Sequence, residues 1–265
     1  MPIEKVFTDQ LQRTVRVNWP PQRIVSLVPS QTELLFDLGL DSQITGVTKF
    51  CIHPEDKVSR KTKIGGTKQL DIALIKKLKP DLIIANKEEN ERLQIETLSK
   101  NFPVWISDIF NLADALEMIR CVGELTDKRK EAADLSTLIT DEFGKLNPFT
   151  RSLKAAYFIW RKPYMVAGKN TFIDHMLSGC GFENAFSESR YPEVSVDRLI
   201  KAAPQVIFLS SEPYPFKEKH LKEFKQLVPD AKIQLVDGEM FSWYGSRLRS
   251  APGYFSTLIN GVNIK

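Results

Sequence analysis

Short apolar runs along the chain are separated by stretches with the spacing of amphipathic helices. The runs at residues 23–28, 82–84, 155–160 and 206–209 are rich in β-branched, aliphatic or aromatic side chains. Apolar runs of this kind are typical of strands in parallel sheets that helices cover on both faces. The pattern therefore predicts an α/β protein rather than an all-helical or all-β one.

One strand–helix unit occurs twice. After the first run, Ser30 and Glu33 have the spacing of a capping box, which satisfies free amides at the start of a helix. That helix is expected to end at Gly39, because glycine is the usual residue just beyond a helix. The run at 155–160 is followed by the same pattern. The corresponding residues there are Thr171, Asp174, Gly179 and Gly181.

A second unit also occurs twice. Asp71 starts a short helical stretch, Pro80 ends it, and the apolar run at 82–84 follows. Ser195, Pro204 and the run at 206–209 repeat this order. In both copies the capping residue lies nine positions before the proline. Two ordered pairs of matching units predict two similar lobes.

The fold class expected is therefore α/β, with two similar parallel-sheet lobes joined by a long helix and a ligand cleft between them. The expected domains are residues 1–108, a helical linker at 109–150, and residues 151–265. Gly123 is expected to break the linker into two helices, the second running over 127–146. Alternation at residues 6–8 and 14–17 predicts a small edge hairpin.

Composition excludes several classes. Hydrophobic residues make up 42% of the chain and charged residues 26%, which is ordinary for a globular protein and excludes disorder. The net charge is +4 with no Lys/Arg block, so no nucleic-acid partner is expected. No stretch approaches the length of a transmembrane helix, so no membrane span is expected.

The ends and cysteines bear on localisation. The first residues show no charged region leading into an apolar core, so the chain as it stands is expected in the cytoplasm. The alternative is the periplasm, if a signal was removed. An odd count of scattered cysteines fits a reducing compartment slightly better. Cys121 and Cys180 are expected to be small buried apolar residues, while Cys51 lies in a candidate binding loop.

Ligands of open parallel sheets bind beyond the carboxyl ends of the strands. That rule selects loops in both lobes, which would form opposite walls of one cleft. The selected segments are 29–31, 48–53, 65–68 and 86–89 in the first lobe and 161–164, 210–216 and 237–247 in the second.

The segment 240–247 holds three aromatic residues within four positions, which neither strand nor helix periodicity explains. Phe241, Trp243 and Arg247 could cover a large, partly apolar ligand. The alternative is a loop that packs on its own lobe. Trp160 at a strand end carries the same two interpretations, and Tyr164 and Tyr191, beside prolines in loops, are further cleft candidates.

Enzyme signatures are mostly absent: the chain has no GxSxG, GxxxxGK[ST], GxGxxG or HExxH pattern. His53 lies in a candidate cleft loop and could ligate a metal. His175 is expected to be structural within a helix, and His220 to be solvated on the surface. The enzymatic alternative combines His53 with cleft carboxylates. Those carboxylates are Asp108, Glu212 and Glu239.

Two segments resemble a known family. The stretch SLVPSQTEL at 26–34, followed by LKPDLIIA at 78–85, resembles the class III substrate-binding proteins of ABC importers, which are helical-backbone receptors for cobalamin, haem and iron–siderophores. The resemblance runs from about Phe7 to near the C-terminus and is closest to the cobalamin-binding branch. It implies two α/β lobes joined by a rigid helix, a bound ligand between them, no catalysis and no intrinsic cofactor.

The resemblance also implies a ligand set. Cobalamin, haem or a ferric siderophore would be held by aromatic contact area, while Lys87, Arg161 and Arg247 would pair with ligand carboxylates or phosphate. Asn86 stands where the cobalamin receptors have a tryptophan. The expected ligand residues are Pro29, Thr48, Phe50, Lys68, Asn86, Lys87, Trp160, Arg161, Tyr164, Tyr191, Phe241, Trp243 and Arg247.

Receptors of this class dock onto a permease through one surface glutamate per lobe. The repeat places Asp197 at the C-lobe position and Ala73 at the N-lobe position, where neighbouring Asp71 could serve. An ABC permease is therefore the expected partner of a monomeric receptor. The rival on the same fold is a cytoplasmic carrier or sensor without transport.

Overall fold

The computed structural model describes residues 3–149 and 152–262, and these form two compact units. The border between the units falls inside the second linker helix, after Ile139. A short later segment, Tyr244–Arg247, belongs to the first unit although both of its chain neighbours belong to the second. Within the described chain, no helix is both long and apolar enough to cross a membrane.

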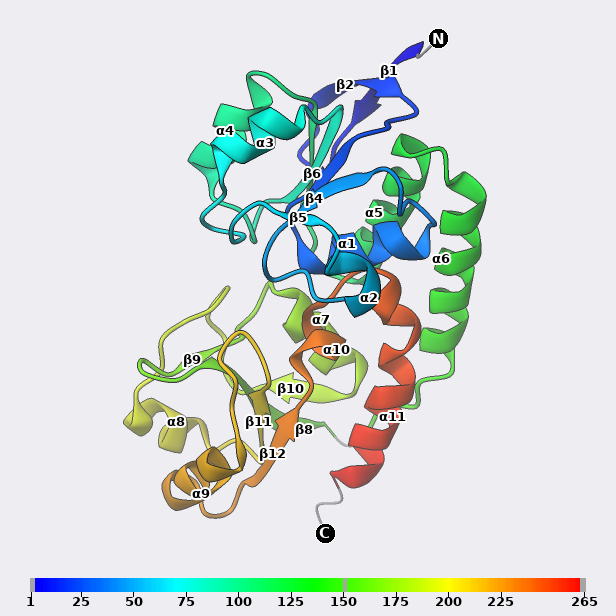
Figure 1. Cartoon of the computed structure of the whole chain (residues 1–265). Helices are drawn as coiled ribbons and strands as arrows, with labels where there is room; N and C mark the ends of the chain where they lie inside the picture. The colour runs from blue at the N-terminus through cyan, green and yellow to red at the C-terminus, as the bar shows by residue number, and fades with distance from the viewer. Residues whose placement is uncertain (1–2, 150–151, 263–265) are drawn as a thin grey trace. The chain divides into compact units, whose positions relative to one another are not determined.

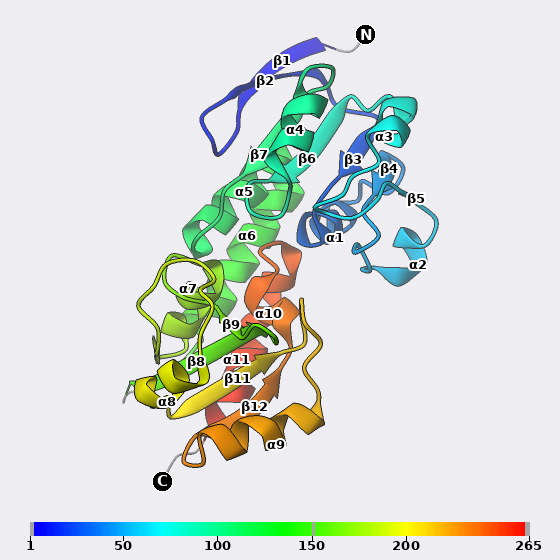
Figure 2. The ribbon, with the colours of Figure 1, turned by 90° about the vertical axis from the view of Figure 1, so that its left-hand side faces the viewer.

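The N-terminal unit is built on a parallel sheet with the order β5-β4-β3-β6-β7. Figure 1 labels β4, β5 and β6 of this sheet, and Figure 2 labels all of its strands. All residues of β6 are buried, as the apolar run at 82–84 predicted, and all residues of β7 are buried as well. The strands are β3 (Ile24–Ser26), β4 (Ile44–Val47), β5 (Thr62–Lys63), β6 (Leu82–Asn86) and β7 (Val104–Ser107). The helices that connect them are α1 (Pro29–Asp37), α2 (Glu55–Val58), α3 (Ile72–Leu78) and α4 (Arg92–Ser99).

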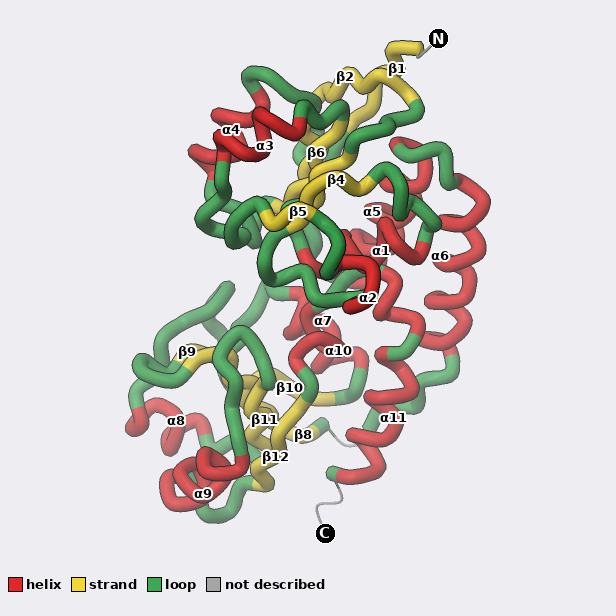
Figure 3. The backbone as a smooth tube through the Cα atoms, viewed as in Figure 1, coloured by secondary structure: helices red, strands yellow, loops and turns green. Residues whose placement is uncertain are grey.

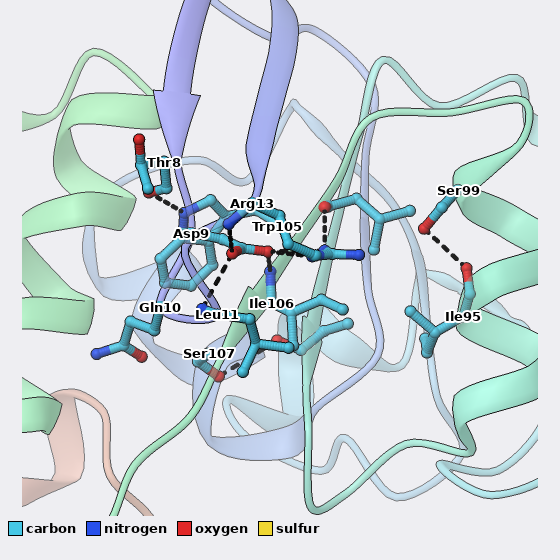
Figure 4. Close-up of polar contacts among 12 residues, drawn as sticks. Thr8, Asp9, Gln10, Leu11, Arg13, Ile95, Ser99, Trp105, Ile106 and Ser107 are labelled. Carbon is cyan, nitrogen blue, oxygen red and sulfur yellow. Dashed lines mark hydrogen bonds and ion pairs between the residues drawn. The ribbon is translucent and has the colours of Figure 1, made fainter.

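The expected edge hairpin is present as β1 (Ile3–Thr8) and β2 (Thr14–Trp19), which pair antiparallel. Its turn is tied to β7 by Asp9, whose carboxylate accepts hydrogen bonds from the amides of Leu11, Arg13 and Ile106 (Figure 4). Asp9 is 2% exposed, and it also pairs with the Arg13 guanidinium at 2.7 Å. The hairpin therefore closes the β7 edge of the sheet.

The C-terminal unit repeats the design, with the parallel order β10-β8-β11-β12 and β9 antiparallel to β8 (Figures 1 and 3). The strands are β8 (Leu153–Trp160), β9 (Met165–Val166), β10 (Phe182–Asn184), β11 (Val206–Ser210) and β12 (Lys232–Val236). The helices are α7 (Phe172–Gly179), α8 (Val196–Ala202), α9 (Glu218–Leu227), α10 (Gly238–Ser242), the short 3₁₀ helix η1 (Ser246–Arg249) and α11 (Ala251–Gly261).

The second repeat is confirmed in detail. Asp71 accepts a hydrogen bond from the amide of Leu74 at the start of α3, and Ser195 accepts one from Arg198 at the start of α8. Both helices then end in a residue with left-handed backbone just before the proline. These residues are Lys79, with φ of 50°, and Ala203, with φ of 45°.

The first repeat is confirmed in only one copy. Thr171 caps α7 by accepting a hydrogen bond from the amide of Asp174. Ser30 does not cap α1: the cap is Val28, Pro29 is the first helical residue, and no side chain caps the helix. Proline can begin a helix one residue earlier than the capping box indicates, because it has no amide hydrogen to satisfy.

The linker contains the two expected helices, α5 (Leu112–Leu125) and α6 (Arg129–Gly144). Gly123 does not break them, contrary to expectation, since it lies inside α5. A Cβ on Gly123 would come within 2.4 Å of the Cβ of Ala132. The glycine therefore permits close packing of α5 on α6, and the chain reverses at Asp127, where φ is 59°.

Candidate functional site

Polar side chains form a buried network at the carboxyl ends of β6 and β7. Asn86 is 2% exposed, and its amide group donates to the Ser107 hydroxyl at 3.0 Å. Its oxygen accepts hydrogen bonds from the backbone amides of Glu88 and Glu89 at 2.8 and 3.0 Å. The Asn86 side chain therefore fixes the backbone of the loop after β6, and it offers no aromatic surface.

Gln31 joins the same network from α1. Its amide nitrogen donates to the Ser107 hydroxyl at 2.5 Å, and the Ser107 hydroxyl donates to the carbonyl of Ala85 at 3.2 Å. The Gln31 side-chain oxygen is buried and accepts no hydrogen bond from the described residues. An unpaired acceptor in this position costs free energy, which a hydrogen-bond donor would recover. Sequence reasoning placed Gln31 in a candidate segment without assigning it a role.

A second buried group lies at the end of β4. The Cys51 sulfur contacts the hydroxyls of Thr32 and Thr48 at 3.1 and 3.2 Å. Burial raises the pKa of the Cys51 thiol, so it stays protonated. Thr48 is fully buried, and it supports the loop that carries Phe50.

The exposed part of this surface carries aromatic and basic side chains. Phe50 is 51% exposed with the Lys49 ammonium 5.1 Å from its ring, and Lys68 donates to the carbonyl of Glu88. Lys87 pairs with Asp108 at 2.6 Å. Pro29 is half-buried at the start of α1.

His53 is half-buried in the same loop as Phe50. Among the described residues no three His, Cys, Asp or Glu side chains gather to hold a metal ion.

Arg247 is already paired within its own unit. Its guanidinium donates to both oxygens of Glu33, at 3.1 and 2.7 Å, and both side chains are 15% exposed. Burial raises the pKa of Glu33, against the opposing effects of Arg247 and His53. Sequence reasoning assigned Glu33 to a helix cap and missed this role, because its partner lies 214 residues away.

In the C-terminal unit, Glu223 gathers two expected ligand residues. Arg161 pairs with it at 2.9 Å, and the Tyr164 hydroxyl donates to it. Burial works against ionisation of Glu223, but the bonds from Tyr164 and Arg161 outweigh it and lower the pKa. The pKa of Tyr164 is raised to about 12, first by burial and then by Glu223. Glu223 gave no sequence signal because it lies in an ordinary Lys/Glu-rich helix.

Two other aromatic candidates reach the surface of this unit. Trp160 is 39% exposed and meets the Tyr214 ring edge-on, with centroids 5.8 Å apart. Tyr191 is half-buried beside the guanidinium of Arg190, which lies 5.8 Å from its ring.

The aromatic segment is not an open loop, contrary to expectation. Phe241 lies in α10 and is fully buried, with ring centroids 5.0 Å from Tyr157 and 4.7 Å from Phe255. Trp243 and Tyr244 are 6% and 7% exposed. The expected alternative, in which aromatic side chains pack on the protein itself, describes Phe241.

Trp243 is fixed by a buried carboxylate. Its indole nitrogen donates to Glu212 at 3.0 Å, and the Ser242 hydroxyl donates to the same oxygen at 2.6 Å. Burial raises the pKa of Glu212, and the two hydrogen bonds oppose this rise. Glu212 thus orients the end of α10.

The remaining polar candidates are resolved individually. His220 is 2% exposed, so the expectation of a solvated side chain is wrong. Its ring accepts a hydrogen bond from the amide of Lys217 at 2.8 Å, and burial lowers the pKa of the imidazole. His175 lies on α7, as expected, and is exposed. Cys180 is buried as expected, whereas Cys121 is half-buried beside Glu117.

Asp71 and Asp197 are both exposed in the first turn region of their helices, and Ala73 is exposed beside Asp71. The two carboxylates differ in position, since Asp71 is itself the helix cap and Asp197 follows the capping Ser195.

The chain thus forms two parallel α/β units, each with its candidate binding residues in loops at the carboxyl ends of the strands. Residues 24–231 match the family of periplasmic binding proteins, and the chain belongs to this family. The resemblance to class III substrate-binding proteins of ABC importers is thereby confirmed, as are the α/β fold class and the expectation of a binding protein instead of an enzyme.

Individual relatives agree with the family. The vitamin B12-binding protein of Pectobacterium carotovorum is 26% identical over 236 residues, which cover 86% of this chain and 84% of that protein. The crystal structure of the periplasmic vitamin B12 binding protein of Vibrio cholerae superposes with a TM-score of 0.76 at 22% identity, covering 91% and 97% of the two chains. The periplasmic heme binding protein of the same organism gives a TM-score of 0.75 at 20% identity, covering 90% and 98%.

Proposed function

We propose that this protein binds a cobalamin-like corrinoid through residues at the carboxyl ends of its two parallel sheets. The relatives named above bind vitamin B12 or heme, so both ligand classes suit the fold. The choice between them rests on the charges that the chain presents.

The observation that carries this choice is the pairing of the expected cations with carboxylates. Lys87 pairs with Asp108, Arg161 with Glu223 and Arg247 with Glu33. A haem carries two propionates, which would have to compete with these carboxylates for the cations. A corrinoid is decorated mainly with neutral amides, which can bond to paired ions and to polar groups without displacing a charge.

Exposed aromatic rings support the proposal. Phe50 and Trp160 are 51% and 39% exposed. The Lys49 ammonium lies over the Phe50 ring, and the Tyr214 ring packs edge-on against Trp160. Burial of one such ring against a flat macrocycle contributes about 1.5–3 kcal/mol to the free energy of binding. They are the two ligand candidates with the most accessible aromatic surface in the described chain.

The test is a titration of the purified protein with cyanocobalamin, haemin and a ferric siderophore, followed by absorbance and tryptophan fluorescence. We expect saturable binding of cyanocobalamin, and at least tenfold weaker binding after Phe50→Ala or Trp160→Ala. Leu93→Ala and Ile200→Ala are matched controls, since both side chains are exposed and lie on α4 and α8. Tighter binding of haemin than of cyanocobalamin would refute the proposal.

We propose that the loaded protein docks onto an ABC permease outside the cytoplasm, through Asp71 and Asp197. Both carboxylates are exposed, so arginines of a partner could reach them. Asp197→Lys should reduce ligand uptake in cells at least fivefold without changing the affinity for the ligand, and Glu193→Lys, at another exposed position, should not. Unchanged uptake with Asp71→Lys and Asp197→Lys combined would leave a carrier without transport as the better description.

A further inference from the structure

The two sheets differ at one edge strand. The internal repeat shows which residues of the two edge strands correspond. Ile83 pairs with Val104 in the N-terminal unit, and Ile207 pairs with Ile233 in the C-terminal unit. On this alignment Val104 corresponds to Ile233, and Ile106 corresponds to Leu235. Strand β7 and strand β12 are therefore equivalent edge strands of their sheets.

In the N-terminal unit the edge is closed. The Ile106 amide donates to Asp9 at 3.3 Å, and the Ile106 carbonyl accepts from the amide of Gln10 at 3.2 Å (Figure 4). The Val104 carbonyl accepts from the Arg13 guanidinium at 3.0 Å. The turn between β1 and β2 thus bonds both peptide groups of Ile106 and the carbonyl of Val104 on the outward side of β7.

In the C-terminal unit the corresponding edge is open among the residues that the structure describes. The amide of Lys232 donates a hydrogen bond to the carbonyl of Gln205 at 2.9 Å, and the carbonyl of Val236 accepts one from the amide of Ser211 at 2.9 Å. The peptide groups of Lys232 and Val236 therefore point toward β11. Peptide groups alternate along a strand, so those of Ile233 and Leu235 point outward. They form no hydrogen bond with any described residue.

A basic groove lies along this open edge. It has a volume of about 600 Å³ and runs between α9 and β12, which lie side by side in Figure 2. Its lining contains lysines and no carboxylate, and none of the lysines forms an ion pair with a described carboxylate. The lining residues are Leu221, Lys222, Lys225, Gln226, Lys232 and Ile233.

We propose that the β12 edge binds an extended acidic peptide segment of a partner protein by strand addition. Backbone hydrogen bonds to Ile233 and Leu235 would supply affinity, and carboxylates of the peptide would meet the lysines of the groove. A second copy of this chain is the weaker occupant, because its own edge would bring Lys222 and Lys232 against the same charges.

The probe is a capped seven-residue peptide in which valine alternates with glutamate, long enough to span the five residues of β12. Amide hydrogen exchange of Ile233 and Leu235 is followed by NMR in the full-length protein. We expect saturable binding and at least tenfold slower exchange of both amides. The same peptide with lysine in place of glutamate should give no protection.

Two controls separate strand addition from simple charge attraction. The acidic peptide N-methylated along its pairing edge keeps its charge but lacks the amide donors, and it should not protect the two amides. Lys222→Glu should weaken binding of the acidic peptide about fivefold. Lys130→Glu, on the exposed side of α6, should leave it unchanged.

Three results would overturn the proposal. The first is an absence of protection by the acidic peptide at millimolar concentration, and the second is equally strong binding of the N-methylated and basic peptides. Protection that grows with protein concentration without peptide would show that a second copy occupies the edge.

Discussion

Arg247 and Glu33 join two segments that lie 214 residues apart in the sequence but within one unit. The guanidinium donates to the two carboxylate oxygens at 3.1 and 2.7 Å. The segment that carries Arg247, Tyr244–Arg247, packs within the N-terminal unit although the chain around it belongs to the other. Gly245 makes this possible, because a Cβ there would lie 2.5 Å from the carbonyl oxygen of Ser30.

The Arg247 and Glu33 side chains should stabilise the protein cooperatively. Both partners are 15% exposed, so removing either one leaves a poorly solvated charge. We expect Glu33→Ala and Arg247→Ala each to lower the free energy of unfolding by about 2 kcal/mol. The double variant should lose less than the sum of the two, with a coupling of about 1 kcal/mol in urea denaturation. Additive losses would show that the two side chains do not interact in solution.

Glu212 should make stability depend on pH. Burial raises its pKa above the ordinary value of 4.5, so the native state binds the proton more tightly than the unfolded chain. Its contribution is therefore greatest below pH 4.5 and is lost as the pH rises through the raised native pKa. Glu212→Gln retains an oxygen for Ser242 and Trp243, so the variant should gain stability relative to the wild type as the pH rises from 4.5 to 8.

The measurement is urea denaturation at several pH values in that range. Glu193→Gln, at an exposed carboxylate of the same unit, is the matched control and should show no such gain. Identical pH dependences of the Glu212→Gln protein and the wild type would contradict the prediction.

Gly123 should tolerate no side chain. Alanine there would place its Cβ 2.4 Å from the Cβ of Ala132 and 2.9 Å from the carbonyl oxygen of Lys128. We expect Gly123→Ala to destabilise the protein by about 1–3 kcal/mol, although alanine favours a helix. Gly144→Ala on α6 has open space and should be neutral or stabilising. Partial rescue of Gly123→Ala by Ala132→Gly would identify the clash, and a stable Gly123→Ala protein would exclude it.

Asp9 should hold the hairpin turn on β7. Its carboxylate is 2% exposed and satisfies the amides of Leu11, Arg13 and Ile106. Asp9→Ala should therefore cost about 3 kcal/mol and speed the amide exchange of Ile106. Glu4→Ala, which removes an exposed ion pair of 3.6 Å with Arg16, should cost less than about 0.5 kcal/mol. Unchanged exchange at Ile106 would show that the edge is closed without Asp9.

The sequence determined the repeating strand–helix units, because local signals encode them. Asp71, Ser195 and Thr171 cap their helices as the spacing predicts, since a cap needs only a side-chain oxygen and amides two or three residues away. Apolar strands such as β6 and β11 are buried along their whole length for an equally local reason.

Only the tertiary structure decided which polar and aromatic side chains meet. Glu33 with Arg247 and Glu223 with Arg161 are pairs between distant segments, and no pattern of nearby residues marks them. The same holds for Phe241, whose segment the sequence presents as a loop but whose ring packs against Tyr157 and Phe255. Burial depends on what the folded chain brings alongside a residue, so periodicity within one segment cannot supply it.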